Sequence, residues 1–253
     1  MLSSRVRLTV ALFVCAVFLG TTAQAAMIGI NFEGSSGNGK SVGPTKVAGV
    51  EPQSHWNDLT SGFSQLASVV DDSGNTIAGL VVNPNNGDEE FNSYVFVDPP
   101  FDGDSYLMRG YMDNFSGSPV SVVVTGLGAP FTTHGYDVIV YFDGDNPSSD
   151  WLTAYAIAVG GAPFATIYGK DDQDTSAWDG QFHEASGATA DSATVGNYVR
   201  FTGLTSGDFT LTAMPQTGDG PINGIQIVAV PEPAALALLG LGLAATLARR
   251  RQT

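Results

Sequence analysis

Cysteine and histidine are both scarce. Cys15 is the one cysteine in 253 residues, and it lies in an apolar stretch at the start of the sequence. A single thiol cannot form an intramolecular disulfide or a thiolate metal cluster. His55, His134 and His183 lie far apart and lack the i, i+4 spacing of a zinc-binding helix. The sequence therefore excludes a disulfide scaffold and argues against a zinc centre.

Positive charge is also scarce. Ten lysine and arginine residues stand against 25 acidic residues, which gives a formal net charge of −15. Half of the basic residues lie near the two ends of the sequence. A surface this acidic repels phosphate backbones, so we expect no nucleic-acid partner. Excess acid keeps a protein soluble and can attract cations.

The segment from Met1 to Ala25 has the pattern of a secretory signal peptide. It has early arginines, an apolar stretch from Leu8 to Leu19, and the small-residue triplet Ala23-Gln24-Ala25. The apolar stretch is shorter than the ~20 residues that a membrane-spanning helix needs. We therefore predict export and cleavage after Ala25, which removes Cys15 and leaves the mature protein without cysteine.

The region 26–229 has the pattern of a single all-β domain. Short runs rich in Val, Ile, Thr and aromatic residues are separated by Gly, Asn, Asp and Pro, as in a sandwich or barrel. No repeat or long linker divides the region. Trp56 to Leu66 is the only modest helix candidate. We expect two packed sheets, with strands at Met27–Glu33, Thr76–Val82, Ser93–Val97, Val120–Thr125, Tyr136–Phe142, Leu152–Val159, Phe164–Tyr168, Asn197–Thr202, Asp208–Ala213 and Ile222–Val228.

The string Gly-Asp-Ser-Tyr-Leu, Gly103 to Leu107, is the strongest hint of catalysis. A serine nucleophile needs a histidine base and usually an orienting carboxylate. This string lies mid-chain, no Asp-x-x-His pair follows near the end, and no Gly-x-Ser-x-Gly elbow exists. We therefore expect a turn leading into a strand at Tyr106–Met108, and a protein that is not an enzyme. A secreted hydrolase that uses Ser105 is the distant alternative.

Two acidic loops are candidate ion sites. The segments Asp143–Asp150 and Asp171–Asp174 concentrate side-chain oxygens at strand ends, and calcium prefers flexible oxygen ligands. The first loop lacks the glycine and terminal glutamate of an EF-hand, and Asp and Asn also simply form turns well. Calcium is therefore the one candidate cofactor. Its candidate ligands are Asp143, Asp145, Asn146 and Asp150.

The tryptophans are candidate sugar-binding residues. All three lie beside aspartates in predicted loops, and aromatic rings stack on sugars while carboxylates accept hydrogen bonds from hydroxyl groups. The alternative is that these rings plug the ends of the sandwich. The candidates for glycan binding are Trp56, Trp151 and Trp178.

The segment 230–253 combines a motif, an apolar stretch and a basic cluster. Pro231, Glu232 and Pro233 precede the apolar stretch Ala234–Ala248, which is followed by three arginines, Arg249, Arg250 and Arg251. This order resembles the PEP-CTERM sorting signal of bacterial exported proteins. The resemblance implies recognition and cleavage by a membrane-embedded exosortase, in systems associated with exopolysaccharide and biofilm matrix.

The apolar stretch of this segment favours a transient membrane helix. Its fifteen residues rise about 22 Å as a helix, which is short for a ~30 Å hydrocarbon core. The arginines would stay on the cytoplasmic side. We expect an inner-membrane intermediate and then a cell-surface or extracellular location.

Several strings of the ectodomain resemble uncharacterised domains of PEP-CTERM proteins. They include INFEG, YDVIVYFDGD, GNYVRFTGL and NGIQIV. The first and last also resemble galactose-binding-like jelly rolls, which implies a jelly-roll β-sandwich whose first strand pairs near its last. A fold alone does not assign a function. We expect a non-enzymatic surface or matrix protein that binds extracellular polysaccharide, with a purely structural matrix role as the alternative.

Overall fold

The computed structural model describes residues 25–33, 41–60, 64–85, 102–113, 117–144, 151–171 and 178–231. One compact unit spans Ala26–Val230. The predicted signal peptide, the apolar stretch and the arginines lie outside the described residues. No helix in the described part is long and apolar enough to cross a membrane.

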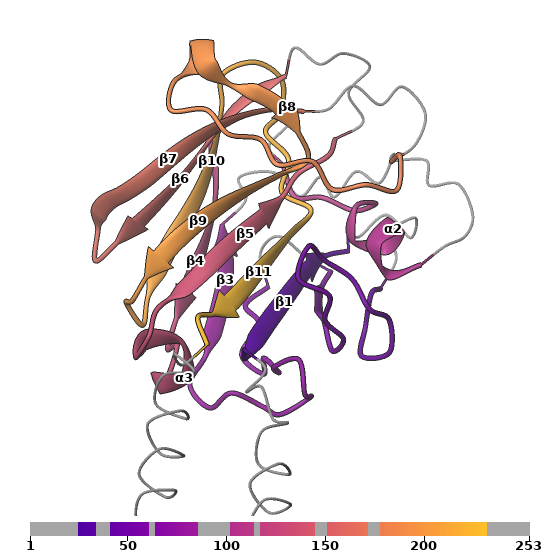
Figure 1. Ribbon diagram of the computed structural model, residues 1–253, viewed down its shortest axis with the longest axis vertical. Coiled ribbons are helices and arrows are strands. Elements are labelled where there is room, and N and C mark those ends of the chain that lie inside the picture. The colour runs from indigo at the N-terminus through magenta and orange to yellow at the C-terminus, as the bar shows by residue number, and fades with distance from the viewer. Residues whose placement is uncertain are drawn as a thin grey trace, which may run out of the picture. The chain divides into compact units, whose positions relative to one another are not determined.

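The described part is an all-β sandwich of two sheets (Figure 1). Neighbouring strands are antiparallel, except that β2 runs parallel to β1 and β8 runs parallel to β7. The five-stranded sheet has the order β2 (Asn57–Leu59), β1 (Met27–Phe32), β11 (Gly224–Ala229), β5 (Tyr136–Tyr141) and β9 (Tyr198–Leu204). The six-stranded sheet has the order β3 (Val81–Asn85), β4 (Val120–Thr125), β10 (Phe209–Pro215), β6 (Leu152–Val159), β7 (Ala162–Asp171) and β8 (Thr194–Gly196). The short helices are α2 (Gly103–Leu107), α3 (Ala129–Thr132) and the 3₁₀ turn η2 (Ala190–Ser192).

The main core lies between the two sheets. Alternate residues of β4 and β10, among them Val122 and Leu211, point inward and are fully buried. They meet inward residues of the facing sheet such as Val140 and Ile227. Because side chains alternate along a strand, the intervening residues of β4 and β10 point outward and are partly exposed.

A second core cluster covers the outer face of the five-stranded sheet. Ile139 and Tyr141 of β5 point to this side, where segment 41–56 and helix α2 pack over them. The near-continuous apolar pattern of β5 is typical of a strand covered on both faces, and its residues belong to both core clusters. The cluster consists of Val42, Ala48, Trp56, Leu107, Met108, Ile139, Tyr141, Trp178 and Tyr198.

Two local predictions are wrong. Gly103–Leu107 is a helix and not a turn before a strand, because the Asp102 side chain caps it by accepting from the Ser105 N–H at 2.8 Å. Asn57–Leu59, inside the helix candidate, is strand β2. Its Asn57 side chain donates to the Gly29 carbonyl and accepts from the Val70 N–H, and these tertiary contacts override local helix propensity.

Most of the predicted strands are found, with shifted bounds. Strands β4 and β6 match at both ends. Strand β3 begins at Val81, later than predicted, and contains Pro84, which an edge strand tolerates. The strand expected at 93–97 lies outside the described residues.

The first and last strands of the sandwich are neighbours. Strand β1 pairs antiparallel with β11 in the register Ile30↔Ile225, which confirms the expected pairing of these segments. The Ala229 N–H donates to the Ala26 carbonyl at 2.9 Å, and the Val230 N–H donates to the Gly135 carbonyl. Both ends of the compact unit therefore lie at the same pole of the sandwich.

Candidate functional site

Two of the three candidate tryptophans are packing residues. Trp56 is 3% exposed and Trp178 is 8% exposed. The Trp56 ring packs on Gly29 and lies 6.2 Å from the Tyr141 ring, while its Nε1–H donates to the Gln53 carbonyl at 3.1 Å. Side chains and backbone largely cover both rings, which belong to the cluster over the outer face of the five-stranded sheet and not to the ends of the sandwich.

Trp151 is the tryptophan that stays partly exposed. One face of its ring packs against the backbone of Gly218, where an added Cβ would overlap the ring and where φ is +72°. The Trp151 carbonyl accepts from the Asp171 N–H at 3.0 Å. The indole is thus held at the start of β6 and stays partly exposed.

The two acidic loops begin beside each other. Asp143 and Asp171 are both buried, and the Gly144 N–H donates to Asp171 Oδ2 at 3.1 Å. The Asn223 side chain accepts from the Asp143 N–H and donates to the Asp143 carbonyl. The other predicted calcium ligands, Asp145, Asn146 and Asp150, lie outside the described residues. Within the described ranges, no group of three or more acidic, histidine or cysteine side chains is arranged to hold a metal ion.

Ser105 is engaged in the helix that contains it. Its side chain is buried, and its hydroxyl donates to the Asp102 carbonyl at 3.0 Å. Among the described residues no histidine contacts Ser105. His55 lies 3.0 Å from the Asp72 carbonyl and His183 lies 3.2 Å from Asp179 Oδ2. The arrangement of a serine hydrolase is therefore not formed around Ser105.

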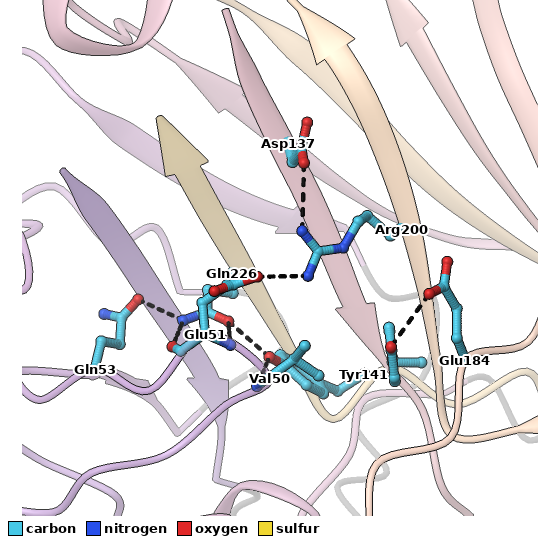
Figure 2. A network of polar contacts seen from close by, with 9 residues as sticks. Val50, Glu51, Gln53, Asp137, Tyr141, Glu184, Arg200 and Gln226 are labelled. Atoms are coloured by element: carbon cyan, nitrogen blue, oxygen red, sulfur yellow. Dashed lines mark hydrogen bonds and ion pairs between the residues drawn. The ribbon is translucent and has the colours of Figure 1, made fainter. Parts of the chain in front are cut away.

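A polar network fastens the covering segment 41–56 to the five-stranded sheet (Figure 2). Arg200 of β9 donates to Glu51 at 2.7 Å and to Asp137 of β5 at 3.4 Å. The Tyr141 hydroxyl donates to Gln226 Oε1 at 2.7 Å and accepts from the Val50 N–H at 2.8 Å. We did not expect this network from the sequence, although Gln226 in the otherwise apolar strand NGIQIV and Arg200 in GNYVRFTGL were signals that could have indicated it.

Burial and neighbouring charges shift the pKa values of two groups in this network. Burial raises the pKa of the Tyr141 hydroxyl, which keeps the hydroxyl protonated as a donor. Burial lowers the pKa of Arg200, but the hydrogen bond and charge of Glu51, with those of Asp137, outweigh that effect and raise it overall. Both groups therefore keep fixed protonation states near neutral pH. The network is suited to holding the segment in place and not to proton transfer.

The segment that follows β11 carries a motif that a family model matches. Strand β11 ends at Ala229, and the exposed Pro231 is the last described residue. Residues 229–252 match the model of the PEP-CTERM protein-sorting motif. The chain carries a PEP-CTERM sorting motif. This PEP-CTERM protein is thus an exported exosortase substrate with a C-terminal membrane anchor before cleavage.

Two further comparisons concern the PEP-CTERM protein as a whole. No curated protein matches its sequence. Its fold has a distant likeness to the native structure of a family 35 carbohydrate binding module from Clostridium thermocellum, with a TM-score of 0.34 and 10% identity over 59% of this chain and 92% of that chain. A TM-score of this size does not establish a shared topology.

Proposed function

We propose that the exported sandwich is a non-catalytic protein of the cell surface or extracellular matrix that binds polysaccharide there. The sorting motif supports the route of export. The observation that supports glycan binding is Trp151, whose indole is fixed against Gly218 and yet partly exposed. An aromatic face held in this way can stack on a sugar ring.

Binding of the 26–230 unit to polysaccharides tests this proposal. This unit contains all described strands and both core clusters. We expect it to sediment with at least one insoluble or producer-derived polysaccharide, and Trp151→Ala to weaken that binding by about tenfold. A nucleobase stacked on an aromatic side chain contributes ~1–3 kcal/mol, and we expect a stacked sugar ring to contribute a similar amount. Thr202→Ala, which changes an exposed side chain, is the control.

A purely structural matrix role is the alternative. It predicts that no polysaccharide, including the producer's own, is retained by the 26–230 unit. That result would exclude the glycan-binding proposal while leaving sorting by exosortase untouched, because sorting depends on residues 229–252.

We propose calcium as a stabilising ion of the acidic loops. The contact between Gly144 and Asp171 supports this, because it brings together the starts of the segments 143–150 and 171–174. Calcium would bind carboxylate and carbonyl oxygens there. If the proposal holds, the melting temperature of the 26–230 unit rises with calcium and falls with a chelator. An unchanged melting temperature in calcium would exclude it.

The proposal also covers three features of export and fold. We propose removal of a signal peptide after Ala25, a transient membrane helix over 234–248, and a jelly-roll arrangement of the sandwich. The pairing of β1 with β11 supports the last of these. Immunoblotting with antibodies against the ectodomain should separate a membrane-inserted precursor from a shorter, released protein.

A further inference from the structure

The outer face of the six-stranded sheet has a row of small uncharged side chains across five strands. Thr212 of β10 lies opposite Ser121 of β4 on one side and Ala156 of β6 on the other. Ala156 lies opposite Thr166 of β7, and Ser121 lies opposite Asn85 of β3. All five alternate with inward residues, so they share the outward face.

A second row repeats this chemistry one pleat further along. Thr210 lies between Val123 and Ala158, and Val123 lies opposite Asn83. Across the part of the chain that the structure describes, the hydroxyls of Ser121, Thr210 and Thr212 make no hydrogen bond with protein groups. They are thus free to bond to water or to a ligand.

Aromatic and apolar side chains border these rows along β7. Tyr168 lies opposite Ala154, and Phe164, at the β-bulge of the same strand, is 45% exposed. Phe164 is one of the few large apolar side chains that are exposed in the described part of the chain. The face therefore offers ring surfaces at one margin and short side chains with free hydroxyls across its centre.

Charge is nearly absent from this face. Lys170, at the end of β7, is the one charged residue among the outward-facing positions of the six strands. The chain as a whole has 25 acidic residues, so acidic side chains are concentrated elsewhere. An anionic polymer would be repelled by the molecule and would find almost no cation here, whereas a cationic polymer would be drawn to the acidic loops.

We propose that the outer face of the six-stranded sheet binds the chain of an uncharged polysaccharide. The sugar rings would lie on Tyr168 and Phe164, and sugar hydroxyls would bond to Ser121, Thr210 and Thr212. The proposal rests on glycan binding as the function of the ectodomain and adds a second binding surface to the one proposed at Trp151. An uncharged polyhydroxyl chain matches both the missing charge and the free hydroxyls of the face.

A lysine in the centre of the face tests the inference. Three variants of the 26–230 unit are mixed with insoluble cellulose, chitin and starch, and the bound fraction is measured after sedimentation. Thr212→Lys and Thr166→Lys place a charge on the face, and Thr133→Lys is the control. Thr133 is exposed and follows α3, away from the sheet face. We expect Thr133→Lys to bind like wild type and both face variants to bind at least about tenfold more weakly, because a bound glycan would desolvate the new charge. Circular dichroism confirms that each variant is folded.

The outcomes separate this inference from the function proposed above. Binding that is lost in Trp151→Ala but kept in both face variants overturns the inference and leaves glycan binding at Trp151. Binding that is lost in both face variants and kept in Thr133→Lys supports it, whether or not Trp151→Ala also weakens binding. A wild-type dimer that becomes monomeric in Thr212→Lys, with no binding to neutral glycans, would overturn it by assigning the face to a second copy of the chain.

Discussion

At the scale of single residues, glycine and tryptophan decide how the five-stranded sheet is covered. Gly29 of β1 points to the outer face, where the Trp56 ring lies on its backbone. The sequence presents Trp56 as a loop aromatic beside an aspartate, but the missing side chain at Gly29 gives the ring a buried place. No local pattern reveals this pairing, because the two residues lie in different elements.

The substitution Gly29→Ala tests the contact between Gly29 and Trp56. An added Cβ would lie 2.5 Å from Trp56 Cδ2, which forces the ring or the strand to move. We expect the free energy of unfolding to fall by about 1–3 kcal/mol, as for overpacking in other cores. Chemical denaturation of the 26–230 unit measures it.

Gly128→Ala is the matched control for this substitution. An added Cβ there would meet only the Pro130 side chain at 3.7 Å, which is an ordinary contact. Equal stability of the Gly29→Ala and wild-type proteins would contradict the packing of Trp56 on β1.

At the scale of elements, segment 41–56 is a cover that the sheet holds by polar contacts as well as by packing. Arg200 reaches Glu51 of the cover and Asp137 of the neighbouring strand, and its side chain is 22% exposed. The Val50 N–H and the Gln226 side chain add further bonds around Tyr141. The cover therefore depends on one partly buried cation in an acidic protein.

The substitution Arg200→Met should loosen this cover. It removes two ion pairs and leaves Glu51 and Asp137 near each other without a cation, so we expect a loss of about 1–2 kcal/mol in stability, discounted for partial exposure. Hydrogen exchange should rise first at the Val50 amide, which bonds to Tyr141. Lys170→Met, which removes a cation from the other sheet, is the control.

Adding Glu51→Gln to Arg200→Met separates pairing from packing. If the ion pair carries the effect, the two substitutions are less costly together than the sum of their separate costs. Strict additivity, with unchanged exchange at Val50, would show that Arg200 does not hold the cover.

At the scale of the whole molecule, the sandwich is complete where the sorting motif begins. Strand β11 lies between β1 and β5, and among the described residues at this end the Val230 N–H makes the last backbone hydrogen bond. Cleavage within β11 would remove bonds of a central strand. Cleavage after it would leave the sandwich intact.

Deletion of Pro231–Pro233 tests the sorting motif without disturbing the fold. We expect the deleted protein to fold normally, because no strand is shortened, but to stay with the membrane fraction and to lose nearly all release to the surface or medium. Fractionation and immunoblotting of the producing cells measure release. Thr253→Ala, outside the matched residues 229–252, is the control, and normal processing of the deletion variant would contradict the role of the motif.

The sequence by itself determined the all-β class, most strand positions and the sorting motif. These follow from local patterns: alternation along β4 and β10, Gly and Asp at turns, and the contiguous order of residues 229–252. Each depends on neighbours along the chain, so each can be read without a structure. The observed start of β3 differs from the predicted start by several residues, because pairing with β4, and not local propensity, sets the boundary of this strand.

Only the tertiary structure decided which candidate side chains are accessible. Trp56, Trp151 and Trp178 look alike in the sequence, yet long-range packing buries the first and third and leaves Trp151 partly exposed. The uncharged face centred on Thr212 exists only because strands distant in sequence pair in one register. Burial and cross-strand register are properties of residues brought together from far apart, and a local pattern carries no information about them.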